Sequence, residues 1–218
     1  MKDPKDCPQD FILVHIGKCG GTTIAPTLRK HGINFTRKHL CTIQYENNEK
    51  YVLLLRNPIG RFVSAFNWRK HLVCNTQVQK HRFDGEEYLL NTYGTVNSLA
   101  ERIYSKNDQM IDFSQRSQLY IHHIREDIHF YIGDFLKECD SNNIVGVIVT
   151  ETIGEDMKNI FGINVTRHAK NNKDIRAYPL SDLAYKNLKK YLWKDYQCIE
   201  RLFELNLISN KQYEILSH

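Results

Sequence analysis

An α/β fold with a central parallel sheet flanked by helices is the fold class that this sequence predicts. Three short apolar runs have the continuous character of strands buried on both faces of a parallel sheet. Segments that favour helices alternate with these runs, which is the pattern of a doubly wound sheet. The chain has 218 residues, of which 41% are hydrophobic. This is enough to bury a core, so we expect a single domain over residues 1–218.

The first two apolar runs each lead into an expected helix. FILVHI at residues 11–16 ends in a glycine-rich turn, and residues 22–30 after it can form a helix. YVLLL at residues 51–55 is followed by an Asn-Pro pair. Because asparagine is a good N-cap and proline suits the first helical position, a helix should start there and continue through residues 61–69.

The third apolar run, IVGVIV at residues 144–149, predicts the third strand. Later in the chain, Ser181 and Asp182 open a long helical pattern whose apolar positions continue to Leu202. Between residues 75 and 132 the sequence is polar, with short helical patches at 86–90 and 99–104. Residues 167–174 (RHAKNNKD) are expected to form a basic loop.

The composition narrows the class of protein. A net charge of +5 favours anionic ligands, but 30 basic residues are mixed with 25 acidic ones, so nucleic-acid binding is not expected. No segment has the length of a membrane span, and the first ten residues are too polar for a signal peptide; we expect a cytoplasmic protein. Six cysteines, at 7, 19, 41, 74, 139 and 198, lack zinc-site spacing, so we expect reduced thiols and no metal.

Residues 15–23 (HIGKCGGTT) form the first motif with a chemical meaning, because they lie where a strand turns into a helix. Two glycines let the backbone approach an anion, and the helix N-terminus offers N–H donors. Lys18 adds a positive charge, and Thr22 and Thr23 add hydroxyl donors. The motif therefore predicts a phosphate cradle; the alternative is a plain turn without a ligand.

A second motif follows the second strand. Arg56 ends the YVLLL run, and Ser64 lies two turns into the next expected helix. With this spacing the side chains of Arg56 and Ser64 can contact one phosphate from two sides.

The two motifs together resemble those of sulfotransferases that use 3′-phosphoadenosine-5′-phosphosulfate (PAPS). HIGKCGGTT is similar to their 5′-phosphosulfate loop, HIPKTGGT, and LLLRNPIGRFVSAF is similar to their 3′-phosphate motif, RDPxxRxxSAY. The likeness is to the carbohydrate-type branch. Weaker similarities lie at residues 113–121, at Thr150-Glu151 and at Lys194-Asp195-Tyr196.

This resemblance implies a P-loop-like sulfotransferase fold and direct transfer of a sulfuryl group from PAPS to a hydroxyl of a carbohydrate or small-molecule acceptor. The product would be adenosine 3′,5′-bisphosphate, and no metal would be needed. Arg56 and Ser64 would hold the 3′-phosphate, and Lys18 would contact the 5′-phosphosulfate and its bridging oxygen. The residues expected to line the cofactor site are Lys18, Cys19, Gly20, Gly21, Thr22, Thr23, Arg56 and Ser64.

The sequence departs from the family pattern at two positions of the loop. Gly17 stands where proline is usual, and Cys19 stands where threonine or serine is usual. Arg61 also matches a motif arginine, although a packing or surface role explains it equally well.

The transfer reaction needs a general base near Lys18. His39 lies between the two motifs, where histidines of this branch often lie, and is our first candidate; His31 and Glu46 are the alternatives. An exposed histidine in a basic turn is the other interpretation of His39. No role is predicted for His122 and His123.

Two rival functions stay open on the sequence. A nucleotide kinase or NTPase would need Ser or Thr directly after the loop lysine, where this chain has Cys19. A catalytically inactive protein that binds PAPS or a sulfated glycan would keep both motifs without turnover.

Overall fold

The computed structural model of the chain describes residues 7–104, 121–165 and 180–218. The basic loop expected at 167–174 and nearly all of the segment 113–121 lie outside these residues. The described chain forms two compact units. Unit 1 contains residues 7–58, 127–165 and 194–218, and unit 2 contains residues 59–104, 121–126 and 180–193. The single domain stays a prediction.

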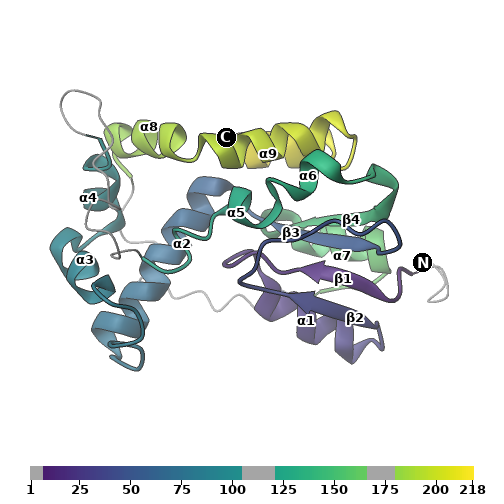
Figure 1. Ribbon diagram of the computed structural model, residues 1–218, viewed down its shortest axis with the longest axis horizontal. Coiled ribbons are helices and arrows are strands. Elements are labelled where there is room, and N and C mark those ends of the chain that lie inside the picture. Colours follow the sequence, from purple (N-terminus) through teal and green to yellow (C-terminus); the bar gives the residue numbers. More distant parts are fainter. Residues whose placement is uncertain (1–6, 105–120, 166–179) are drawn as a thin grey trace. The chain divides into compact units, whose positions relative to one another are not determined.

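Unit 1 is built on a four-stranded, all-parallel sheet with the strand order β2-β1-β3-β4 (Figure 1). The strands are β1 (Phe11–Val14), β2 (Phe35–Lys38), β3 (Tyr51–Leu55) and β4 (Ile144–Val149). The predicted α/β class and parallel sheet are therefore confirmed. Strands β3 and β4 have the predicted bounds, whereas β1 ends two residues before the apolar run does.

Strand β2 was not predicted, because its sequence FTRK lacks an apolar run. It pairs with β1 alone, so it forms an edge of the sheet, and its last three residues are exposed. Polar and charged residues are usual on edge strands, where they oppose pairing with other chains. The pair Val14↔Lys38 fixes its register and brings the residue after Lys38 to the end of β1.

Helices cover both faces of the sheet in unit 1. Ile12 pairs with Tyr51 and shares its face, so Phe11 points to the opposite face. The ring of Tyr51 packs 4.8 Å from that of Phe135, at the start of α6 (Phe135–Glu138). The ring of Phe11 packs 5.7 Å from that of Phe161, at the end of α7 (Ile153–Phe161). The sheet is thus covered on two sides, as a doubly wound fold requires.

The remaining helices of unit 1 add apolar side chains to the same core. They are α1 (Gly21–Lys30), α5 (Ile128–Ile132), α10 (Asn210–Ser217) and all but the first residue of α9 (Trp193–Glu204). Short 3-10 turns lie at Ser141–Asn143 and Thr150–Thr152.

The long C-terminal helix was predicted as one element but is two. Ser181 caps α8 (Asp182–Tyr191) as expected, since its side chain accepts the N–H of Ala184. The helix stops before Leu192, and α9 starts at Trp193. The apolar pattern continues through this break, so periodicity could not reveal it.

Unit 2 is helical in the residues described. Helix α2 (Pro58–Lys70) starts at the predicted proline and continues into a π-helical turn at His71–Asn75. The patch predicted at 86–90 lies within α3 (Glu86–Tyr93). The patch predicted at 99–104 overlaps α4 (Val96–Glu101) only in part, because this helix starts and ends three residues earlier. Helix α8 packs on α4, where Asn187 donates to the carbonyl oxygen of Ala100 at 3.0 Å.

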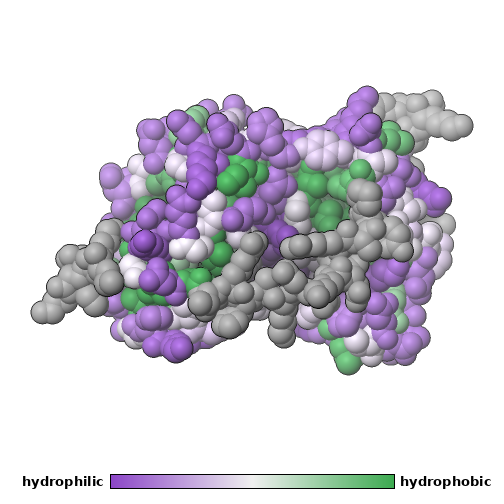
Figure 2. All heavy atoms as spheres, turned by 180° about the vertical axis from the view of Figure 1, so that it is seen from behind, coloured by the Kyte–Doolittle hydropathy of each residue, from purple (hydrophilic) through white to green (hydrophobic). Residues whose placement is uncertain are grey.

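The surface agrees with the polar composition. Hydrophilic residues cover much of the face seen from behind, with hydrophobic ones showing between them (Figure 2). Among the helices described, none combines the length and the apolar character that crossing a bilayer demands. All six cysteines lie in the described residues and are free thiols.

Candidate functional site

The residues singled out in the sequence gather where the strands of unit 1 end. His15 and Lys18 follow β1, His39 follows β2, Arg56 follows β3, and Thr150 follows β4. Because the strands are parallel, these positions share the carboxyl end of the sheet. The strand order reverses between β1 and β3, and in open α/β sheets ligands bind in the crevice at such a switch point. Lys18 and Arg56 flank this point.

The loop between β1 and α1 turns through two left-handed residues. Lys18 has φ 71° and Gly20 has φ 79°. For a lysine this conformation is unfavourable by on the order of 1 kcal/mol, and such backbone strain is concentrated at functional sites. The N–H of Cys19 closes the turn onto the carbonyl of Ile16 at 3.2 Å. The first N–H groups of α1 are left at the mouth of the loop, as at every helix N-terminus.

The two loop glycines are required for different reasons. Gly20 provides the left-handed N-cap residue of α1. A side chain at Gly21 would begin 2.1 Å from the ring of His15, so only glycine leaves room for that imidazole. The sequence predicted that both glycines serve an anion, but the second also accommodates His15.

Cys19 lies differently from the other loop residues. Its side chain is fully buried in the core, with Sγ 3.8 Å from the carbonyl oxygen of Gly17. Cys19 therefore contributes packing, while Lys18 and Thr23 are half-buried and Thr22 is exposed.

Arg56 connects the ends of three strands. Its guanidinium approaches the carbonyl oxygen of Lys18 at 3.4 Å and the Glu151 carboxylate at 3.6 Å. The hydroxyl of Thr150 donates to the carbonyl of Leu55 at 3.0 Å, which ties β4 to β3. The side chain of Arg56 remains 28% exposed, so it is accessible to an anion beside the loop.

His39 stacks on His15, with ring centroids 4.2 Å apart and an interplanar angle of 17°. Nδ1 of His39 lies 2.7 Å from the carbonyl oxygen of His15. A carbonyl can only accept, so Nδ1 carries the proton in this contact. In the neutral ring Nε2 is then the nitrogen with the lone pair, which is the state that a general base needs.

Burial lowers the pKa of His15 to about 4, and the electrostatic influence of His39, Arg37 and Lys18 acts in the same direction. His15 is therefore neutral near pH 7. The unfolded chain binds a proton at this histidine near pH 6.5, whereas the folded chain does so only near pH 4. The free energy of unfolding therefore falls as the pH drops from 6.5 to about 4, and above pH 6.5 His15 causes no loss.

We expect His15→Phe, which keeps an aromatic ring but cannot titrate, to flatten this pH dependence. Between pH 7 and pH 5 the wild-type chain should lose about 2 kcal/mol of unfolding free energy through His15. Urea unfolding of both proteins at the two pH values measures the difference. Carboxylates titrate in both proteins, so their effect cancels when the two are compared. If the variant loses as much unfolding free energy as the wild type, His15 is not the source of the pH dependence.

The other candidate residues lie elsewhere. His31 is exposed at the end of α1, so it precedes β2 and lies at the opposite end of the sheet from Lys18. The backbone of Glu46 donates to the hydroxyl of Tyr51, the first residue of β3, also away from the loop. Ser64 is half-buried on α2 in unit 2, and its contact with the 3′-phosphate stays a prediction. Arg61 is fully buried and donates to the carbonyl oxygens of His123 and Glu126.

The sequence could not have indicated His15 as a partner of His39. The contact depends on β2, whose polar sequence gives no strand signal, and on the absence of a side chain at Gly21.

Comparison of the chain with protein-family models, with curated proteins and with solved structures finds no match in any of the three.

Proposed function

We propose that this chain is a sulfotransferase that moves a sulfuryl group from PAPS to a hydroxyl-bearing acceptor, a carbohydrate or small molecule. One observation carries the proposal. Lys18 of the glycine loop and Arg56 of the second motif flank the switch point of the parallel sheet, with 3.4 Å between the Arg56 guanidinium and the Lys18 carbonyl. Two separate cationic motifs at one ligand crevice suit a donor with two separate phosphate groups.

The chain's own residues supply each part of the chemistry. When bound, PAPS supplies the sulfuryl group and leaves as adenosine 3′,5′-bisphosphate. Nε2 of His39 takes the proton of the acceptor hydroxyl as its oxygen bonds to sulfur. Lys18 neutralises the charge on the phosphate oxygen from which sulfur departs, and the N–H groups at the start of α1 assist it. Arg56 pairs with the 3′-phosphate.

His39 is favoured as the base over its alternatives for two reasons. It follows β2 and so shares the carboxyl end of the sheet with Lys18, whereas His31 and Glu46 lie toward the other end. The contact with the carbonyl of His15 also places the proton on Nδ1, so that in the neutral ring Nε2 carries the lone pair that a base needs. His15 is thus a positioning residue, since it acts through His39.

The position of Cys19 argues against an NTPase. In nucleotide-triphosphate loops the residue after the lysine presents a hydroxyl to Mg²⁺. Here that side chain is fully buried in the core of unit 1, away from any ligand of the loop.

The test is transfer of ³⁵S from labelled PAPS to a panel of sugars, glycans and hydroxylated small molecules. We expect a labelled acceptor together with adenosine 3′,5′-bisphosphate, and no product with Lys18→Ala. ATP hydrolysis is the control reaction. Hydrolysis of ATP without transfer of label would refute the proposal, whereas tight bisphosphate binding with every acceptor inert would identify the inactive binder.

A further inference from the structure

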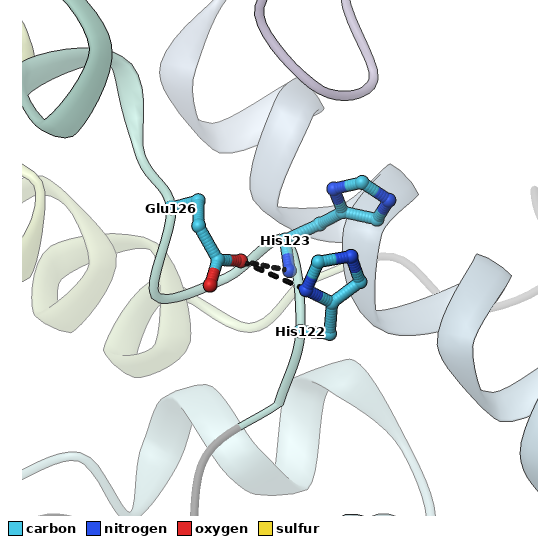
Figure 3. Close-up of side chains that lie close together, drawn as sticks. All are labelled: His122, His123 and Glu126. Atoms are coloured by element: carbon cyan, nitrogen blue, oxygen red, sulfur yellow. Dashed lines mark hydrogen bonds and ion pairs between the residues drawn. The ribbon is translucent and has the colours of Figure 1, made fainter. Parts of the chain in front are cut away.

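A second potential site lies in unit 2, where three side chains of the types that ligate metals lie on one turn. His122, His123 and Glu126 offer donor atoms that all lie within 4.8 Å of one another (Figure 3). Nδ1 of His122 is 3.1 Å from Oε2 of Glu126. The side chains of this pair are only 10% and 14% exposed.

The backbone of the turn brings the two imidazoles to one side. His123 has φ 66°, a left-handed conformation that is uncommon for residues other than glycine. In an extended chain neighbouring side chains point apart, but here the two rings lie 4.1 Å from centroid to centroid. An unfavourable backbone conformation that gathers ligating side chains is the kind of local strain found at binding sites.

Buried residues of α2 and α3 hold this turn in place. The fully buried Arg61 donates to the carbonyl oxygens of His123 and Glu126. Glu86, itself paired with Arg69, accepts the backbone N–H of His122 at 2.8 Å. The ring of His122 also stacks on Phe83 at 4.5 Å. These contacts hold the backbone of the turn and the ring of His122, as outer contacts commonly do around metal ligands.

We propose that His122, His123 and Glu126 bind one divalent transition-metal ion of the zinc type, which would stabilise unit 2. Two imidazoles and a carboxylate, with water as a fourth ligand, form an established zinc donor set. Ligands of a tetrahedral zinc ion lie about 3.3 Å apart for bonds of about 2.0–2.1 Å. The His122–Glu126 separation is already close to this value. The other donor atoms lie within 4.8 Å of one another, so side-chain rotation has to bring them closer to complete the set.

This site was not predicted from the sequence, which gave the expectation of no metal. Zinc ligands on one element are usually spaced by two to five residues, and adjacent histidines normally point apart. The left-handed backbone of His123 instead brings the rings of the two adjacent histidines together. An ion pair between protonated His122 and Glu126 is the competing explanation, and metal titration separates the two.

The experiment uses the full chain after treatment with a chelator and its removal. Zn²⁺ is titrated by calorimetry, and Co²⁺ is added separately for its visible spectrum. We expect one equivalent of Zn²⁺ at micromolar or tighter affinity. Co²⁺ should give the visible bands of a nitrogen and oxygen site without the near-ultraviolet charge transfer of a thiolate ligand.

Two conservative variants test the ligands. Glu126→Gln keeps an oxygen for the His123 N–H, and His123→Asn keeps a residue that tolerates the left-handed backbone. Each should weaken Zn²⁺ binding by more than about 100-fold, since loss of outer partners alone commonly costs 10–100-fold. His81→Ala, at an exposed histidine of unit 2, should leave binding unchanged. No Zn²⁺ bound by the wild-type chain, a thiolate spectrum, or unaltered affinity in both variants would overturn the proposal.

Discussion

Replacing His39 by alanine is expected to lower kcat for sulfuryl transfer by about 10²–10⁴, the usual range for loss of a general base. The expectation follows from the contact between Nδ1 of His39 and the carbonyl of His15, which places the proton on Nδ1 and the lone pair of the neutral ring on Nε2. The acid limb of the wild-type kcat/KM profile, which a histidine base produces, should disappear in the variant. Steady-state kinetics over a range of pH measures both effects.

The control for this variant is binding of adenosine 3′,5′-bisphosphate, which should be nearly unchanged. The phosphates are assigned to Lys18, Arg56 and the start of α1, and none of these is His39. His31→Ala should retain full activity, because His31 lies at the opposite end of the sheet. Normal turnover of His39→Ala with an inactive His31→Ala or Glu46→Ala would show that the base has been misplaced.

Breaking the buried ion pair of unit 2 is expected to destabilise the protein strongly. Arg69 and Glu86 are each about 1% exposed, and two contacts of 2.8 and 2.6 Å join guanidinium to carboxylate. Arg69→Met leaves that carboxylate buried without its cation, which costs about 3–5 kcal/mol. For a chain of this size the melting temperature should fall by roughly 6–20 °C, measurable by calorimetry.

The matched control is the neighbouring exposed pair of Lys80 and Glu87, whose atoms lie 3.2 Å apart with side chains about one third exposed. Lys80→Met should cost no more than about 1 kcal/mol, as exposed pairs usually do. Adding Glu86→Gln to Arg69→Met should restore part of the loss, because the amide is neutral and still accepts the His122 N–H. Equal losses of unfolding free energy in Arg69→Met and Lys80→Met would show that burial does not make the Arg69–Glu86 pair more important than an exposed pair.

The sequence predicted those parts of the fold whose signal is local. Continuous apolar runs gave β3 and β4 with their bounds, and Pro58 and Ser181 gave two helix starts. Strand β2 was missed because an exposed edge strand needs no apolar residues. The break at Leu192 was missed because the apolar pattern is continuous through it. Both features are decided by packing between distant segments, which no local pattern records.

The candidate site was predicted in the same uneven way. Lys18 and Arg56 were found from their motifs, and the sheet brings them to one end. Cys19 was expected to line the site, but its side chain lies in the core. The left-handed conformation of His123 is one that histidine disfavours, so its residue type gave no sign of it. The stacking of His15 on His39 depends on strand β2, which the residue types of that segment did not indicate.

Calorimetric titration with adenosine 3′,5′-bisphosphate tests the central claim most directly, because it needs no knowledge of the acceptor. We expect one equivalent to bind, and Arg56→Ala to weaken binding by about 10–150-fold, which is 1.5–3 kcal/mol for a charge-assisted contact. Ser64→Ala should cost about 1 kcal/mol, and adenosine 5′-phosphosulfate, which lacks the 3′-phosphate, should bind both variants as it binds the wild type. Binding of ATP with Mg²⁺ but not of the bisphosphate, or equal losses for both nucleotides in Arg56→Ala, would contradict the account.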